Sequence, residues 1–320
     1  MDITKITVGV TGASGMLGVY ICRSLLAAGA TVYGIVRNPD KASFLEKEGV
    51  LFAKADLNDR QALTEAFKNC DAIVSNAALY KMGTALETYI KPFYFGKNKT
   101  WNENYKANKE GTENVYEAAA AAGCKRIVQI STVALYYWKY GKPALNEQSR
   151  MLNGAKREGG AYRATKQLSQ QLAFAISEKH GLKTTTLQPG TIYGARDSNL
   201  TPLLNRLMKY PVLPLPKFSI PLVYAHDAAQ CVVAALKNDN SIGQTYMIGG
   251  MNATLYEIGR AWKEAVGKGP LSFPIPVPVW NGIYVDCGKA EKELGFRNKP
   301  LVDGFREILE EDARGRYNIT

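Results

Sequence analysis

A glycine-rich turn between a strand and a helix constrains this chain more than any other feature. The segment ITVGVTGASGMLG, residues 6–18, opens with an apolar run that predicts a buried strand, and an apolar-periodic helix over residues 16–28 follows its glycines. Gly12 would permit a tight turn, Gly15 would let a pyrophosphate approach the backbone, and Gly18 would let the helix pack closely on the strand. The N–H groups and partial positive charge of the helix N-terminus would then bind the phosphates, so the segment predicts a dinucleotide site.

Strand and helix patterns alternate behind this turn, which is typical of an α/β fold with a parallel sheet and helices on both faces. Six strands in this rhythm predict a doubly wound, Rossmann-type sheet. Further strands are expected at residues 31–36, 50–54, 72–75, 126–131 and 183–188, and helices at residues 41–48, 59–67, 105–122 and 160–180.

The rhythm loosens after Pro189, where prolines become frequent and the segments more extended. Expected beyond it are a helix capped by Asp227, a strand at residues 244–248, a helix after Thr254 and a polar terminal helix. We therefore expect a dinucleotide-binding domain at residues 1–189, to which residues 225–250 return. Residues 190–320 would mostly form a smaller, substrate-binding lobe.

Composition excludes several classes of protein. No apolar run approaches the roughly 18 residues of a membrane-spanning helix, and the start of the chain does not resemble a signal peptide. The five cysteines are widely spaced and there are only two histidines, so we expect neither a disulfide framework nor a metal site. The net charge of +11 comes from scattered lysines and arginines, which favours a basic surface that attracts anionic small molecules. We expect a cytoplasmic protein that binds neither nucleic acid nor membrane.

A long aromatic connection at residues 78–104 interrupts the alternation. Connections of this length are often lids or binding loops, but an insertion that packs its own aromatic side chains is an equally good interpretation. Both interpretations stay open from the sequence.

The segment YRATK carries the clearest chemical signal. On a helix, Tyr162 and Lys166 share one face, so a phenol and an ammonium would point the same way. Lowering a phenol's pKa from about 10 by three units takes about 4 kcal/mol. One positive charge about 4 Å away, in an effective dielectric constant of 20, supplies about that much. The pair therefore predicts a tyrosine that transfers protons at neutral pH.

Small polar residues end two neighbouring strands of the predicted sheet. Ser131 and Thr132 follow the fifth strand, where a hydroxyl could hold a substrate oxygen while Tyr162 moves its proton. Asn76, at the end of the fourth strand, is a candidate for fixing the backbone, and the alanines after it would let a cofactor lie close. Because the carboxyl ends of parallel strands meet at one edge, these groups are expected to lie together.

These motifs resemble the extended short-chain dehydrogenase/reductase family, which includes the NAD-dependent epimerase/dehydratases. The matching segments run in order along nearly the whole chain. They are TGASGMLG (11–18), Asp56-Leu57, Asn76-Ala77-Ala78, STVALY (131–136), YRATK (162–166), QPGTIYG (188–194), YAHDAA (224–229), and KAEKELGF followed by PLVDGFREIL. In pattern the chain is most similar to the NADP-dependent ketone and alcohol reductases.

The resemblance implies a role for each matching residue. Tyr162 would be the acid/base, Lys166 would bind the nicotinamide ribose, and Thr132, with Ser131 before it, would orient the substrate. Asp56 would hold the adenine. The implied cofactor-binding set is Gly12, Ser14, Gly15, Met16, Leu17, Gly18, Arg37, Asn38, Asp56, Leu57, Asn76, Ala77, Ala78, Tyr162, Lys166, Pro189, Gly190 and Ile192. In this family the helices equivalent to residues 105–122 and 160–180 often build a homodimer. The resemblance therefore implies a possible homodimer for this chain.

The end of the second strand indicates which cofactor is bound. NAD enzymes usually carry a carboxylate there for the ribose hydroxyls, whereas this chain has Arg37 and Asn38. A charged arginine contact to a 2′-phosphate is worth roughly 1.5 to 3 kcal/mol. We therefore expect a preference for NADP(H), with NAD(H) as the alternative.

Departures from the family narrow the reaction. Related dehydratases carry an Asp-Glu pair where this chain has Val133 and Ala134, and related epimerases commonly carry Asn in place of Gly190. Carbonyl/alcohol redox chemistry remains, with an apolar or aromatic substrate between residues 80–104 and 211–223. The alternatives are a sugar-nucleotide epimerase, in which Lys217, Arg196 or Arg260 would grip the diphosphate, and a non-catalytic NADP(H)-binding sensor.

Overall fold

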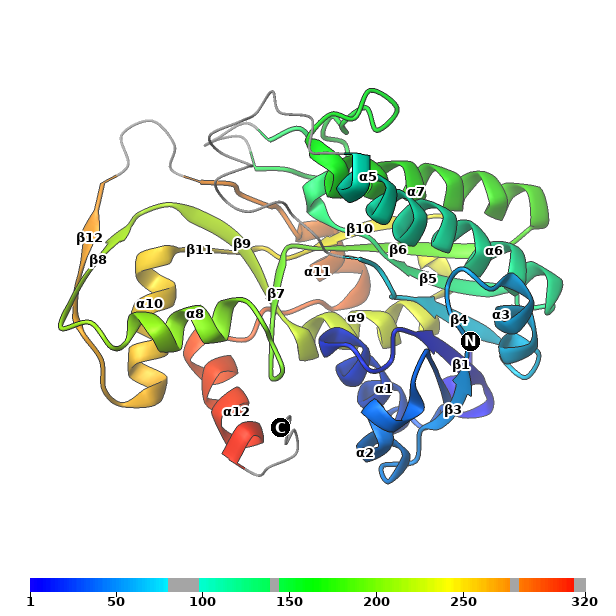
Figure 1. Ribbon diagram of the computed structural model, residues 1–320, viewed down its shortest axis with the longest axis horizontal. Coiled ribbons are helices and arrows are strands. Elements are labelled where there is room, and N and C mark those ends of the chain that lie inside the picture. Colours follow the sequence, from blue (N-terminus) through cyan, green and yellow to red (C-terminus); the bar gives the residue numbers. More distant parts are fainter. Residues whose placement is uncertain (80–97, 139–143, 277–281, 314–320) are drawn as a thin grey trace.

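The computed structural model describes residues 1–79, 98–138, 144–276 and 282–313. At its centre is a seven-stranded sheet in which every pair of neighbours is parallel (Figure 1). From edge to edge the strands are β10 (Thr245–Ile248), β6 (Lys183–Pro189), β5 (Arg126–Ile130), β4 (Ala72–Ser75), β1 (Thr7–Thr11), β2 (Thr31–Val36) and β3 (Leu51–Lys54). This order is that of a doubly wound sheet, and the predicted fold class is confirmed.

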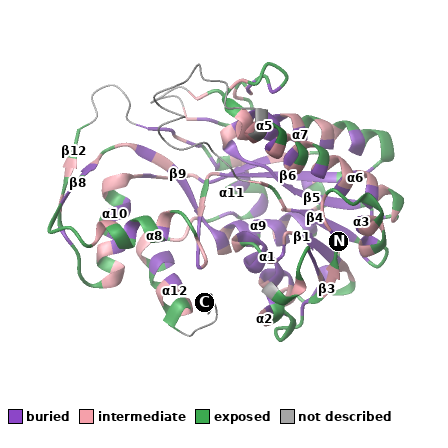
Figure 2. Cartoon of the chain, in the orientation of Figure 1, coloured by how far each residue is buried: buried purple, intermediate pink, exposed green. Residues whose placement is uncertain are grey.

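Helices cover both faces of the sheet because successive strand residues point in opposite directions. Ile73 and Ile127 enter one apolar core, and Val74 and Val128 enter the other. The first core packs against α3 (Arg60–Phe67), α6 (Gly111–Ala121) and α7 (Gly160–His180), and the second against α1 (Met16–Ala27) and α9 (Ala225–Lys237). Figure 2 shows the central strands β4 and β5 as buried along their whole length.

Two expected helices have different boundaries in the structure. The helix expected at residues 105–122 is helical from residue 98 onward, as α5 (Asn98–Asn104), a π-helical stretch (Tyr105–Glu110) and α6. Its polar first turns, NKTWNEN, lack an apolar stripe but pack against α7. The helix expected at 41–48 is shorter, a 3₁₀ turn (Pro39–Ala42) followed by α2 (Ser43–Glu46).

The expectation that Asp227 caps a helix was wrong. The helix α9 begins two residues earlier, at Ala225, and the Asp227 carboxylate instead accepts a hydrogen bond of 2.7 Å from the backbone N–H of Lys299. This bond connects α9 to the segment between α11 (Gly288–Leu294) and α12 (Leu301–Ala313).

The remaining elements extend from the middle of the molecule, where β7 lies, to the left end of its long axis in Figure 1. They include a three-stranded sheet of β7 (Thr191–Tyr193), β9 (Ser219–Tyr224) and β11 (Met251–Thr254), a two-stranded parallel sheet of β8 (Val212–Pro216) and β12 (Leu271–Ile275), and the helices α8 (Leu200–Leu207) and α10 (Leu255–Val266). A reciprocal capping box between Thr254 and Glu257 starts α10. Within the described ranges, no helix has both the length and the apolar character that crossing a bilayer requires.

Candidate active site

The glycine turn has the geometry that close contact with a phosphate requires. Gly12 has a φ of +68°, and a Cβ there would lie 3.0 Å from the Cα of Ala77. A Cβ on Gly18 would lie 2.2 Å from the carbonyl oxygen of Gly12, so only glycine permits this approach of α1 to the turn. Gly15 is the N-cap of α1 and has no side chain to bond the first N–H groups of the helix, which leaves them for an anion. The turn therefore fits a dinucleotide.

The neighbouring residues of the turn lie at the surface or just beneath it. Ser14 and Met16 are half-buried and Leu17 is buried beside them. The turn is tied to the end of β4, because the backbone N–H groups of Asn76 and Ala77 both donate to the Thr11 hydroxyl, at 3.0 and 3.1 Å. The Asn76 amide donates back to the Thr11 carbonyl at 3.3 Å, whereas Ala78 is exposed. The structure thus brings the ends of β1 and β4 together.

The residues expected to bind the adenosine end of the cofactor also share one edge. Arg37 and Asn38 are exposed directly after β2, and the Ala55 N–H donates to the Val36 carbonyl at 3.1 Å, which joins the ends of β2 and β3. The Asp56 carboxylate follows and accepts two hydrogen bonds from Asn58, at 2.7 and 2.8 Å. Leu57, beside it, is half-buried against Gly111.

Tyr162 and Lys166 lie in the first two turns of α7. The ammonium of Lys166 is 6% exposed and donates to the carbonyl of Ile130, the last residue of β5, at 3.0 Å. Burial lowers the pKa of this ammonium to about 8, so most molecules carry the charge at neutral pH. Tyr162, four residues earlier, is half-buried. Tyr162 and Lys166 therefore lie on one helix, and the hydrogen bond to Ile130 fixes the ammonium at the end of β5.

Two hydroxyls follow β5 in the same place. Thr132 is buried, and its hydroxyl accepts from the Ala134 N–H at 3.1 Å, which caps the 3₁₀ turn Val133–Leu135. Ser131 is also buried, and its hydroxyl has no hydrogen-bond partner among the described residues.

Two residues that sequence patterns did not single out connect these groups. The guanidinium of Arg163 donates to the carbonyls of Ala134 and Tyr136, at 2.6 and 2.7 Å, and lies 3.9 Å from the ring centre of Trp138. It therefore holds the segment after Thr132 against the turn of α7 that carries Tyr162. Its position inside the YRATK motif is the feature of the sequence that could have identified it as a site residue.

Asn108 lies in the π-helical stretch and is 2% exposed. Its amide accepts from the Leu79 N–H at 2.8 Å and donates to the Leu79 carbonyl at 3.1 Å and to the Thr165 hydroxyl at 3.3 Å. One side chain thus joins the segment after β4 to the middle of the YRATK motif. Such π-helical stretches are frequent at functional sites.

The chain after β6 is packed too closely at Gly190 for a side chain at that position. Pro189 is buried, Gly190 donates to the Ile248 carbonyl at 3.0 Å, and Ile192 is half-buried in β7. A Cβ on Gly190 would lie 2.6 Å from the backbone oxygen of Pro221 in β9. An asparagine at this position would require the backbone of β9 to move.

The sheet order and the glycine turn are those of a Rossmann-type dinucleotide-binding protein. The helix that carries Tyr162 and Lys166 is bonded to the end of β5. The sequence matches the profile of the NAD dependent epimerase/dehydratase family over residues 8–249, and the chain belongs to this family. The predicted resemblance to the extended short-chain dehydrogenase/reductases, the group that includes this family, is confirmed. Among the described residues, no three His, Cys, Asp or Glu side chains are grouped to hold a metal ion.

Known proteins similar to the chain include reductases and epimerases. It is 32% identical over 61% of its length to a 4-hydroxy-2-methyl-3-oxo-4-farnesyl-3,4-dihydroquinoline-1-oxide ketoreductase of Stigmatella aurantiaca. It is 27% identical over 71% of its length to a 2-alkyl-3-oxoalkanoate reductase of Shewanella oneidensis. The alignments span 53% and 56% of these relatives, about half of each. The structure of a Bacillus cereus UDP-glucuronic acid 4-epimerase in complex with UDP-glucuronic acid and NAD has the same fold. Its TM-score is 0.76 at 22% identity, and the match covers 96% of this chain and 99% of that one.

Proposed function

We propose that this enzyme transfers a hydride between NADP(H) and a carbonyl or alcohol group of a hydrophobic or aromatic substrate. The observation that carries the proposal is the buried Lys166 ammonium, bonded to the last carbonyl of β5, on the same helix as Tyr162. Thr132 lies two residues beyond that carbonyl, and the next two positions, Val133 and Ala134, carry no acid or base. This set supports one proton transfer but not the elimination of water.

Each side chain has one role in the proposed reaction. Bound nicotinamide supplies or accepts the hydride at the substrate carbon. Thr132 and Tyr162 hold the substrate oxygen, and Tyr162 gives its proton to that oxygen during reduction. The Lys166 ammonium stabilises the resulting phenolate and, through water, leads to its reprotonation. Oxidation of the alcohol uses the same groups in reverse.

The proposal assigns the cofactor to residues 1–189, with residues 225–250 completing that domain, and most of the substrate pocket to residues 190–320. The glycine turn would hold the pyrophosphate, Asp56 and Leu57 the adenine, and Arg37 with Asn38 the 2′-phosphate of NADP(H). Tyr162 and Lys166 would contact the nicotinamide ribose, next to Asn76–Ala78 and the segment from Pro189 to Ile192.

The substrate class rests on what the site lacks and on the relatives. Gly190 lies where epimerases commonly carry asparagine, and its contact with Pro221 leaves no room for that side chain. Two relatives are named as reductases of oxo compounds. Of the expected pocket wall, residues 80–97 lie outside the described residues. The other expected wall was residues 211–223. Its β9 part lies beside Gly190, whereas its β8 part pairs with β12 at the far end of the molecule.

A panel of substrates with both cofactors tests this function. With NADPH and apolar or aromatic ketones and aldehydes, we expect the absorbance of the reduced nicotinamide to fall as the alcohol forms. UDP-sugars serve as the comparison, because an epimerase retains its cofactor and shows no net change in that absorbance. Conversion of a UDP-sugar, with every ketone and aldehyde unchanged, would contradict the proposal.

Arg163 is expected to act as a positioning residue for the same reaction. Replacing it with methionine removes both carbonyl contacts, so Thr132 and Tyr162 lose their fixed relation, and kcat should fall roughly 10- to 100-fold. The dissociation constant for NADPH should stay within about twofold, because the glycine turn is untouched. Arg163→Lys keeps the charge but not the guanidinium that reaches both carbonyls, and it should recover part of kcat.

Arg150→Met is the matched control for that experiment. Arg150 also lies over an aromatic ring, 5.1 Å from the centre of Tyr137, but its side chain is exposed and bonds no carbonyl near Thr132. It should leave kcat unchanged. Equal losses in both variants would contradict a specific role for Arg163.

A further inference from the structure

The outer face of the two-stranded sheet at the far end of the molecule is apolar, and no described helix or strand packs on it. We call it the β8–β12 face; it consists of Val212, Pro214, Leu271, Phe273 and Ile275. The strands are parallel and in register, Leu271 beside Val212 and Phe273 beside Pro214, so these side chains share one side. Leu271 is 69% exposed and Phe273 47%. Figure 2 shows the exposed positions along both strands.

This concentration is unusual within the described chain. Eight large apolar side chains are exposed there, and four of them lie on the β8–β12 face, with Leu203 and Tyr210 close by in sequence. Isolated exposed apolar residues need no explanation, whereas a contiguous apolar face indicates an interaction site. The inner side chains Leu213 and Leu215 are buried, and Leu215 packs against Gly259 of α10. The inner face of β8 therefore attaches the strand to the fold, and the outer face is not needed for that contact.

Basic residues are frequent in the segments that carry the face. The two segments that carry it, residues 200–217 and 260–276, contain six lysines and arginines and one acid, Glu264. That acid lies 3.6 Å from Arg306 of α12. An anionic partner would therefore meet both apolar and positive groups.

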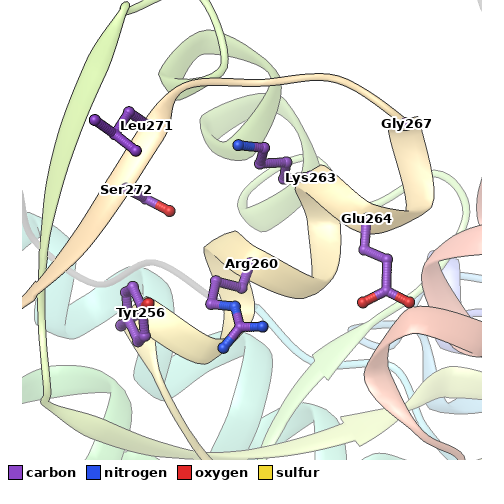
Figure 3. Close-up of a pocket in the computed structure, with 7 residues that line it drawn as sticks. All are labelled: Tyr256, Arg260, Lys263, Glu264, Gly267, Leu271 and Ser272. Carbon is purple, nitrogen blue, oxygen red and sulfur yellow. The ribbon is translucent and has the colours of Figure 1, made fainter.

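An open hollow adjoins the face between α10 and β12. It has a volume of about 520 Å³, and its lining includes Arg260, Lys263 and Leu271. Figure 3 shows Leu271 and Ser272 on the strand side of the hollow, across from Lys263 on α10. Leu271 belongs both to the hollow and to the β8–β12 face, so the apolar face adjoins a hollow lined by two cations, Arg260 and Lys263, and one acid, Glu264.

Two features disfavour a protein strand or a second copy of this chain as the partner. Prolines at 211, 214, 216, 270, 274 and 276 lack the N–H that an added strand would bond. A symmetric contact between two copies would also bring like charges together. The face lies at one end of the long axis (Figure 1), where a flat surface can reach it without covering the glycine turn.

We propose that the β8–β12 face docks this enzyme on the surface of an anionic phospholipid bilayer. The apolar side chains enter the interface, and the surrounding lysines and arginines contact lipid phosphates. The expectation of no membrane partner rested on the absence of a long apolar run. Docking of this kind needs no spanning helix, so that criterion does not apply to it. The proposal does not depend on the reaction catalysed.

Vesicle sedimentation with the full chain tests the proposal. We expect binding to mixed phosphatidylcholine–phosphatidylglycerol vesicles, little binding to pure phosphatidylcholine, and weaker binding at high salt. The double variant Leu271→Asp/Phe273→Asp, and separately Lys209→Glu/Lys217→Glu, should each weaken binding at least about tenfold. These side chains are exposed, so thermal unfolding should be unchanged.

Leu51→Asp is the matched control, because Leu51 on edge strand β3 is 47% exposed, as Phe273 is, and lies outside the face. It should bind vesicles like the parent enzyme. Failure to bind anionic vesicles, or binding that the Leu271→Asp/Phe273→Asp variant retains, would overturn the proposal. A dimer in sedimentation analysis that this variant dissociates would also overturn it and assign the face to a second copy.

Discussion

Replacing Tyr162 with phenylalanine should lower turnover roughly 100- to 10,000-fold, the usual contribution of a positioned acid or base. The change removes one hydroxyl and keeps the ring, so α7 and its contact with the sheet should remain. Affinity for NADP(H) should change little, because the glycine turn and the residues after β2 and β3 provide most of the expected cofactor contacts. The measurements are steady-state turnover with a carbonyl substrate and calorimetric titration of the cofactor.

The size of this effect follows from the position of Lys166. A phenol with a pKa near 10 transfers protons poorly at neutral pH unless a positive charge stabilises its phenolate. In the proposed reaction Lys166 supplies that charge from a buried position, where solvent screens it little, and its hydrogen bond to Ile130 keeps it in place. Without the phenol, the remaining Thr132 hydroxyl can hold an oxygen but is too weak an acid to replace the proton donor.

Tyr137→Phe is the control for Tyr162→Phe. Tyr137 is 48% exposed, and its ring contact with Arg150 does not need the hydroxyl. It should keep full turnover. If Tyr162→Phe also retained turnover, another group would be the proton donor and the proposed reaction scheme would be wrong.

The parts of the fold that could be predicted depend on short-range rules. Gly12 and Gly18 are required by a positive φ and by contact within the turn itself, so the motif locates the turn in the sequence. The Tyr162–Lys166 pair follows from the helical repeat alone. The alternation of strands and helices then orders the sheet, because parallel neighbours need crossover connections of one hand.

The parts that could not be predicted depend on distant partners. Arg163 and Asn108 bond backbone groups of segments that lie 27 to 29 residues away in the chain, and nothing in their own neighbourhood indicates which groups those are. The strand β8 shows a related problem. Its apolar pattern indicated a pocket wall, but a pattern of alternating apolar residues shows only that a face exists. Whether another element covers that face is decided by the tertiary fold.

Arg37→Asp should reverse the proposed cofactor preference. A charge-assisted contact between Arg37 and the 2′-phosphate is worth roughly 1.5 to 3 kcal/mol, so its loss should raise the KM for NADPH roughly 10- to 150-fold. A carboxylate in its place would repel that phosphate and accept the ribose hydroxyls of NADH, whose KM should rise little or fall. Because Arg37 is exposed, the variant should fold normally.

Lys47→Asp separates this local effect from the loss of positive charge over the whole protein. Lys47 is exposed at the end of α2, just before the start of β3, whereas Arg37 follows the end of β2. Its replacement changes the net charge by the same amount. Both KM values should stay near those of the parent enzyme. Arg37→Lys keeps the charge but loses the bidentate contact of the guanidinium, so its KM for NADPH should fall between those of the parent and Arg37→Asp. Equal increases of both KM values in Arg37→Asp would show that the residue does not discriminate between the cofactors, and the assignment to NADP(H) would then lose its basis.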